Sequence, residues 1–139
     1  MAHEKLAPLP HRGFWRELGI SFDAALARLP ETLEAEGFGI ITQINLQEIL
    51  NATLGIDFRR YRIFGTSNPA LCQEALEVDP QFGIILSCNV VLYEDDARRA
   101  LLGIMDPTEQ LGERKHVGHL ALARATGEKL ERVVAALDT

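Results

Sequence analysis

The chain has 139 residues, of which 47% are hydrophobic, and its 14 Lys and Arg residues against 20 Asp and Glu residues give a formal charge of −6. This length favours one domain, and the apolar fraction is too high for a disordered chain. The acidic balance argues against nucleic-acid-binding and anionic-membrane-binding surfaces, because these need clustered basic side chains. We therefore expect a soluble globular domain with no nucleic-acid or membrane partner.

The sequence shows no targeting or membrane segment. No stretch approaches the ~20 apolar residues of a membrane helix, and the N-terminal residues lack the apolar core of a signal peptide. We therefore expect a cytoplasmic protein in which Cys72 and Cys88 are reduced thiols. Residues 1–12 are predicted to be a flexible lead-in, and residues 13–139 a single α+β domain.

The first third of the domain alternates strand and helix signals. A strand is predicted over 14–20, followed by a helix that begins after the N-cap residue Ser21 and ends at Gly37. Pro30 lies inside the helical pattern and predicts a kink or a break. An apolar, β-branched segment then predicts a strand over 38–44.

The middle of the chain predicts two short helices around a strand. A compact helix is expected over 45–55, because the segment begins with a capping box and ends at a glycine. A strand is predicted over 58–64. The second short helix has Asn68 as N-cap and Pro69 at its first position, and it ends before Pro80.

A hairpin and a long helix complete the predicted elements. The apolar runs 83–93 and 97–105 are joined across 94–96 and predict an antiparallel pair. A further helix start is predicted at Asp106, and a longer helix over 114–137. The hairpin and the shortness of the inserted helices favour an α+β two-layer sandwich, with a mostly antiparallel sheet covered on one face by helices.

An arginine cluster is the most informative feature for function. Arg59, Arg60 and Arg62 lie on a predicted strand that leads into the helix start at Ser67 and Asn68. Guanidinium groups beside free backbone N–H groups and a hydroxyl would bind a small anion. The alternative, which we weigh more heavily, is that the arginines pair with the surplus carboxylates while the turn residues only cap the helix.

The strand around Cys88 supplies the remaining candidates. Cys88 and Asn89 point to opposite faces of an apolar strand. Cys88 would be reactive only if its pKa were lowered, and a strand cysteine among aliphatic neighbours is more often inert. We expect the ligand-binding candidates to gather around one hollow, and they are Arg60, Arg62, Ser67, Asn68, Cys88 and Asn89.

Motifs for metals and cofactors are weak. His116 and His119 lie three residues apart on a predicted helix, but the sequence offers no evident third ligand, so ordinary histidines are the favoured interpretation. The chain has no Gly-x-Ser-x-Gly motif of serine hydrolases and no redox Cys-x-x-Cys motif. We therefore expect no metal and no cofactor, and we leave open whether the protein is an enzyme.

Several segments, in order along the chain, resemble landmarks of the domain of unknown function 302 family. They are Glu36-Gly37-Phe38-Gly39-Ile40, Asp57-Phe58-Arg59-Arg60-Tyr61-Arg62-Ile63-Phe64-Gly65, Asn68-Pro69, Cys88-Asn89-Val90-Val91 and Met105-Asp106-Pro107. The resemblance implies a compact bacterial or archaeal α+β domain with a β-α-β(4)-α core, often a homodimer. It implies no established activity. Relatives often carry a cysteine before the Asn-Pro pair, where this chain has Ser67.

Three hypotheses of function follow from the sequence. The first is a non-catalytic or sensory domain that binds a small anionic ligand near the arginine cluster. The second is a thiol-based redox or enzymatic protein that uses Cys88. The third is a structural module that forms a homodimer through an exposed sheet edge or an uncovered sheet face.

Overall fold

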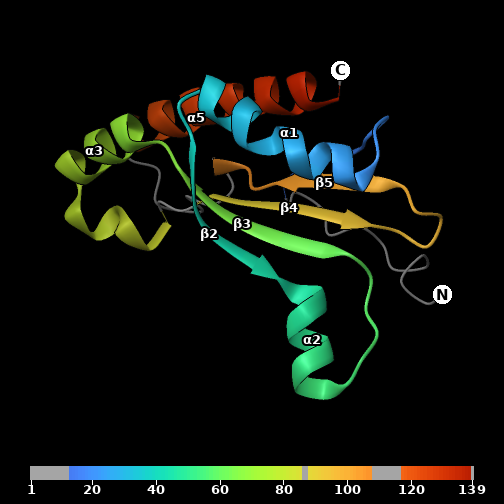
Figure 1. The fold of residues 1–139 in the computed structure, drawn as a ribbon. Coiled ribbons are helices and arrows are strands. Elements are labelled where there is room, and N and C mark those ends of the chain that lie inside the picture. The colour runs from blue at the N-terminus through green and yellow to red at the C-terminus, as the bar shows by residue number, and fades with distance from the viewer. Residues whose placement is uncertain (1–12, 86–87, 108–116, 139) are drawn as a thin grey trace.

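Figure 1 shows the chain as a computed structural model, in which residues 13–85, 88–107 and 117–138 are described. The predicted lead-in over 1–12 lies outside these residues, so it stays a prediction. In the described part of the chain, no helix has the length and apolar character needed to cross a membrane.

Five antiparallel strands form one sheet, in the order β1-β5-β4-β3-β2. In chain order they are β1 (Phe14–Glu17), β2 (Gly39–Asn45), β3 (Tyr61–Ser67), β4 (Cys88–Glu94) and β5 (Ala100–Ile104). The central strand is β4, and β1 and β2 are the two edges. The pairing of β4 with β5 confirms the predicted hairpin.

The helices lie on both sides of this sheet and differ in how closely they pack on it. They are α1 (Phe22–Ala35), α2 (Leu46–Leu54), α3 (Pro69–Val78) and α5 (Val117–Leu137), with a 3-10 helix η2 (Pro80–Ile85) after α3. Helices α1 and α5 cover one face, whereas α2 projects on the opposite side (Figure 1). The fold is thus α+β with a β-α-β(4)-α core and inserted short helices, as predicted.

The hydrophobic core lies between the sheet and helices α1 and α5. Alternate side chains of each strand point to this face, as the pleat of a strand requires. The buried strand residues include Phe64, Val90, Leu92, Leu102 and Ile104, and the helices add Leu29, Leu33, Leu130 and Leu137. The opposite face, here called the uncovered face, carries Trp15, Tyr61, Ile63, Val91, Tyr93 and Leu101.

The predicted helix caps are confirmed. The side chain of Ser21 accepts a hydrogen bond from the backbone of α1, and Asn45 and Asn68 do the same for α2 and α3. Gly55 ends α2 with φ of +65°, a left-handed conformation that glycine adopts without steric cost. Each cap satisfies a backbone N–H or C=O group that a short helix leaves without an internal partner.

The structure corrects several of the predicted elements: β1 ends at Glu17 rather than at residue 20, and β5 begins at Ala100 rather than at residue 97. Helix α1 continues through Pro30 without a break: the proline itself is exposed, and the buried Leu29 and Leu33 on either side of it hold the helix against the core despite the hydrogen bond that proline lacks. Strand β3 begins three residues later than predicted, where Tyr61 first pairs with Tyr93. Residues 83–85 of the predicted strand 83–93 instead belong to η2, where the backbone N–H groups of Gln81 and Phe82 donate hydrogen bonds to Asp79 and close the turn.

The long C-terminal helix is confirmed as α5 over its described part. Most of the helix predicted from Asp106 lies outside the described residues, and so does His116. The side chain of His119 is also outside them, so the interpretation of the histidine pair stays a prediction.

Candidate functional site

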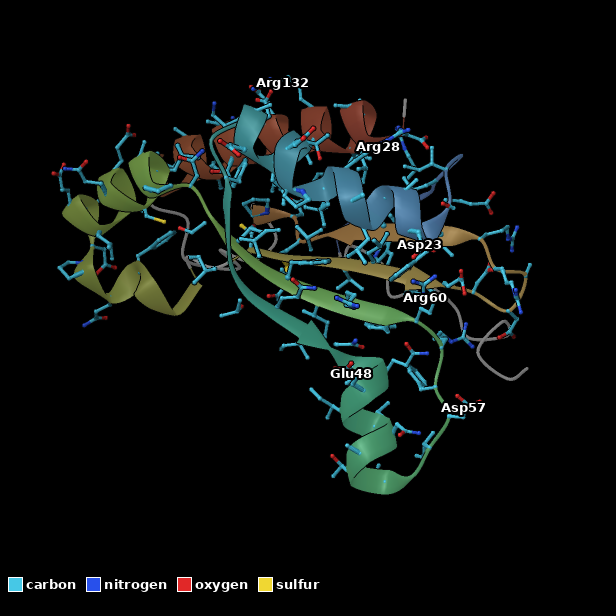
Figure 2. The ribbon with its side chains drawn as sticks, in the orientation of Figure 1. Asp23, Arg28, Glu48, Asp57, Arg60 and Arg132 are labelled. Carbon is cyan, nitrogen blue, oxygen red and sulfur yellow. The ribbon has the colours of Figure 1, made fainter. Side chains whose placement is uncertain are left out.

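Arg60 lies just before β3 and points toward the first turn of α1 (Figure 2). Its guanidinium donates a hydrogen bond to Oδ1 of Asp23 and lies 4.3 Å from the centre of the Phe22 ring, within cation–π range. The hydrogen bond and the charge of Arg60 hold the pKa of Asp23 below its usual range. Arg60 is therefore neutralised within its own chain, as the alternative interpretation of the cluster predicted.

The other two arginines have different environments. Arg62 is half-buried on the same side of β3 as Arg60, and its guanidinium forms no hydrogen bond or ion pair with the described residues. Arg59 reaches the turn between β4 and β5, where it pairs with the carboxylate of Asp96 at 2.9 Å and donates to the carbonyl of Glu94 at 3.4 Å. The three guanidinium groups therefore do not act as one cationic cluster.

Asn68 lies at the opposite end of β3 and joins two helices. Its Oδ1 accepts a hydrogen bond from the Leu71 N–H at the start of α3, and its Nδ2 donates to the carbonyl of Glu36 at the end of α1. Gly37 has φ of +87°, and a Cβ at that position would lie 2.9 Å from the Asn68 Nδ2 atom. Both polar atoms of the buried Asn68 amide therefore form hydrogen bonds that join α1 to α3, which gives this side chain a structural role.

The thiols gather near this same end of β3. The Ser67 Oγ and Cys72 Sγ atoms are 2.8 Å apart, and the buried Thr66 hydroxyl donates to the Cys88 carbonyl. Burial, and after it the charge of the nearby Cys72 thiol, raise the pKa of Cys88 to about 11. Cys88 therefore stays protonated at neutral pH, whereas Asn89 points to solvent from the uncovered face.

The six predicted site residues fall into two groups rather than around one hollow. Arg60 and Arg62 lie at the start of β3, and Ser67, Asn68, Cys88 and Asn89 lie at or beside its other end. Ser67 lies five positions after Arg62 along the strand, which corresponds to about 16 Å. The expected convergence of guanidinium groups on the Ser-Asn turn is wrong, because an extended strand keeps residues close in sequence far apart in space.

Two surface hollows lie away from all six residues. One, of about 520 Å³, is lined by Gln47, Glu48, Asn51, Ala52, Asp57 and Phe58. The other, of about 590 Å³, is lined by Gly13, Phe14, Trp15, Arg16, Glu131 and Val134. Within the described residues, no three His, Cys, Asp or Glu side chains gather as a set of metal ligands.

The uncovered face has a feature that the sequence did not reveal, a row of aromatic rings that crosses the sheet from β1 over β5 and β4 to β3. Trp15 of β1 meets Tyr93 of β4 edge-on, with ring centres 6.1 Å apart, and Tyr93 stacks on Tyr61 of β3 at 5.3 Å. Phe58 continues the row, 6.1 Å from Tyr61. Burial, and then the neighbouring Tyr93, raise the pKa of Tyr61, so its phenol stays neutral at physiological pH.

Gly103 makes the position of Trp15 possible. It lies opposite Trp15 in the pairing of β1 with β5, and the indole ring covers its backbone. A Cβ at Gly103 would lie 2.5 Å from the indole carbons, which is too close for any side chain. Although covered on one side by this glycine, Trp15 remains 53% exposed.

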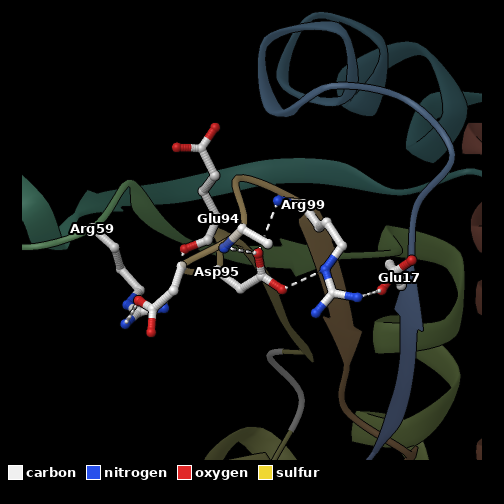
Figure 3. Close-up of polar contacts among 7 residues, drawn as sticks. Glu17, Arg59, Glu94, Asp95 and Arg99 are labelled. Carbon is white, nitrogen blue, oxygen red and sulfur yellow. Dashed lines mark hydrogen bonds and ion pairs between the residues drawn. The ribbon is translucent and has the colours of Figure 1, made fainter. Parts of the chain in front are cut away.

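One edge of the uncovered face is held by a network of charges at the β4–β5 turn (Figure 3). The carboxylate of Asp95 accepts hydrogen bonds from the backbone of Ala97 and from the backbone and guanidinium of Arg99, which also pairs with Glu17 at 2.8 Å. Burial alone would raise the pKa of Asp95, but the hydrogen bonds from Arg99 and Ala97 lower it overall. The turn is therefore a rigid corner of the sheet.

Comparison with known proteins settles the family. The model of the domain of unknown function DUF302 matches residues 16–137. The chain belongs to the DUF302 family. A similar solved structure is the crystal structure of an uncharacterised conserved DUF302 protein from Bacillus stearothermophilus, with 25% identity, a TM-score of 0.78, and coverage of 90% of this chain and 94% of that one. Among curated proteins the comparison finds no match.

Membership of DUF302 confirms the resemblance and the fold, and it supplies no established activity. Part of the aromatic row is visible in the sequence, because residues two positions apart on a strand share one face. This spacing places Tyr61 with Ile63, and Tyr93 with Val91. What the sequence could not provide was the register that places Trp15 beside them.

Proposed function

We propose that this DUF302 domain is a homodimerisation module, in which two copies pack through the uncovered face. The observation that carries the proposal is the aromatic row of Trp15, Tyr93 and Tyr61 on a sheet face that neither α1 nor α5 covers. Contiguous apolar surface on a small domain marks interaction sites, and Trp and Tyr are the residues that most often dominate binding energy.

A second copy is the partner that the DUF302 resemblance leads us to expect. An isologous dimer uses the same patch twice, so one apolar face suffices for both subunits. The row is anchored at its ends by Gly103 beneath Trp15 and by the ion pair of Arg59 with Asp96, which support a rigid surface. Rigid aromatic side chains lose little entropy on binding, which favours association.

The thiol hypothesis has less support. Cys88 is buried in the core, and the direction of its pKa shift is opposite to that of an activated thiolate. The side chain lies on the helix-covered side, away from the uncovered face. We therefore propose a binding function rather than thiol chemistry.

Sedimentation equilibrium across a range of protein concentrations tests the proposal. We expect the wild type to form a dimer and the variants Tyr93→Ser and Leu101→Ser, which alter the uncovered face, to raise the dimer Kd at least about tenfold. Leu76→Ser on α3 is the matched control, because Leu76 is an exposed leucine away from this face. A wild type that is monomeric at every concentration would disprove the proposal.

One observation favours a second function, the binding of a small anion by Arg62 with Arg60. Arg62 is half-buried beside Arg60, and no described carboxylate pairs with it. An anion bound there would compete with Asp23 for Arg60. We expect phosphate or citrate to raise the Tm of the wild type and of Arg28→Gln, but not of Arg62→Gln. If neither anion changes the Tm, this second function is excluded.

A further inference from the structure

Helix α2 is an amphipathic helix whose apolar side chains are only partly covered by the described residues of one copy. The helix has nine residues, none of them buried, and Ile49 and Leu54 are 47% and 63% exposed. Its ends are capped by Asn45 and Gly55, and Gln47 Nε2 donates to the carbonyl of Phe58. Isolated helices of this length are marginal in water, so packing against a further surface would stabilise α2.

The exposed apolar surface continues from α2 onto the neighbouring edge strand. Ile44 of β2 lies opposite Ile63 of β3, which places both on the uncovered face. Ile44 and Ile56, on either side of α2, are 40% and 44% exposed. In the described part of one copy, the uncovered face therefore has no helix packed across it, and the helix next to it, α2, leaves apolar side chains exposed.

Within one copy, α2 cannot pack on the uncovered face, because the helix projects away from the sheet rather than across it (Figure 1). We infer that α2 of each copy packs on the uncovered face of a second copy, so that the dimer exchanges two helical arms. This inference rests on the proposed homodimer and adds the element that completes it. It also identifies which edges of the two sheets meet.

In the dimer that we infer, the two-fold axis runs parallel to the strands, between the two stacked uncovered faces. Such an axis reverses the order of the strands, so β2 of one copy lies over β1 of the other. Because the axis is parallel to the strands, the end of the sheet at which β2 ends lies at the same end of the dimer in both copies. Both α2, which follows the end of β2, and the β4–β5 turn lie at that end, so α2 of one copy meets the turn of the other.

The charges at these two places are complementary. The segment from Gly39 to Phe58 contains two acidic residues, Glu48 and Asp57, and no Lys or Arg. Both acids lie on α2 or the loop after it (Figure 2), and neither carboxylate forms an ion pair with a described residue. At the β4–β5 turn, Arg98 is exposed, and its guanidinium likewise forms no ion pair within the described part of the chain. The dimer pairs Glu48 and Asp57 of each copy with Arg98 of the partner copy.

Sedimentation equilibrium of the full chain tests this arrangement with matched surface variants. We expect the double variant of Ile49→Ser and Leu54→Ser to raise the dimer Kd at least about tenfold. The control is the double variant of Leu76→Ser and Val78→Ser on α3, whose side chains are 38% and 47% exposed. Far-UV circular dichroism and the Tm of each variant, measured at low concentration, verify that the monomer remains folded.

Charge exchange tests the orientation. Arg98→Glu should weaken the dimer, Glu48→Arg should weaken it too, and the two together should restore most of the wild-type Kd. If the α2 variants dimerise like the wild type while Tyr93→Ser does not, the homodimer stands and the exchange of α2 is overturned. A monomeric wild type overturns both. If the α2 double variant weakens the dimer but the charge exchange restores nothing, the orientation is overturned.

Discussion

The two faces of the sheet are built from alternating residues of the same strands, yet they differ in how deeply their side chains are buried and in the helices that pack on them. The face toward α1 and α5 contains Leu92 and Leu102, which are 0% and 1% exposed, whereas their strand neighbours Tyr93 and Leu101 are only half-buried. The covered face resembles the interior of any small domain. Burial of side chains on the covered face therefore provides most of the stability of the fold, whereas the uncovered face has apolar surface available for binding a partner.

The largest difference between the faces should appear when adjacent leucines of β5 are truncated. We expect Leu102→Ala to lower the free energy of unfolding by about 2–5 kcal/mol, because it leaves a cavity in the core. Leu101→Ala, next in the chain but on the uncovered face, should cost about 1 kcal/mol or less in the monomer. Denaturant unfolding at low protein concentration measures both. Equal losses would contradict the distinction between the faces.

A buried group of the covered face, the Cys88 thiol, should also make the free energy of unfolding depend on pH in the alkaline range. The pKa of Cys88 is about 11 in the folded chain against an ordinary value of 9.0, so the folded state holds this proton more tightly. The contribution of Cys88 to the free energy of unfolding is fully present below pH 9. It decreases as the pH rises toward 11, by about 2–3 kcal/mol at most. Urea unfolding between pH 8 and 11 measures the loss.

Two variants isolate the contribution of Cys88. Cys88→Val should remove most of this alkaline loss, because a similar volume remains without a titrating group. Cys72→Ala, which alters the half-buried thiol near it, should keep most of the loss. If Cys88→Val retains the full alkaline loss, the buried thiol is not its source.

The uncovered face can be disturbed at a single glycine. Gly103→Ala should displace the indole of Trp15, because the new Cβ would lie 2.5 Å from its ring carbons, at a cost of about 1–3 kcal/mol. Trp15 is the only tryptophan of the chain, so its fluorescence reports the displacement directly. Gly39→Ala, whose Cβ would meet no atom within 4 Å, is the control. An unchanged emission spectrum in Gly103→Ala would show that the ring does not lie on this glycine.

The smallest effect is expected at the turn that borders the two faces. The pKa of Asp95 is lowered in the folded chain, so the stability it provides is present at neutral pH and is lost as the pH falls below its ordinary value of 3.8. Asp95→Asn should lower the free energy of unfolding at pH 7 by about 1 kcal/mol and flatten the acid dependence. Asp96→Asn, which alters an exposed partner of Arg59, should change less. The reverse order would contradict the role assigned to Asp95.

Much of the fold could be predicted from the sequence because its signals are local. Ser21, Asn45 and Asn68 cap helices through side-chain contacts with residues three positions away, and the β4–β5 hairpin joins adjacent runs. The apolar run before β4 predicts a strand, but the same composition also suits a 3-10 helix, in which Phe82 packs with Ala75 and Ala123.

The candidate site could not be predicted in the same way, because its contacts are distant in sequence. The partner of Arg60 is Asp23, 37 positions earlier, and no local pattern indicates that pair. Arg62 and Ser67 are close in sequence, but the extended strand separates them. Trp15 and Tyr93 meet only because β1 and β4 both flank β5, so the aromatic row depends on the order of strands in the sheet.

Quenching of Trp15 fluorescence by acrylamide, measured as a function of protein concentration, tests most directly that the uncovered face is the binding surface. Trp15 is 53% exposed in one copy and lies on that face. The account predicts that quenching falls as concentration rises, along the same curve as the increase in mass measured by sedimentation. A dimer whose Trp15 is quenched as readily as that of the monomer would contradict it.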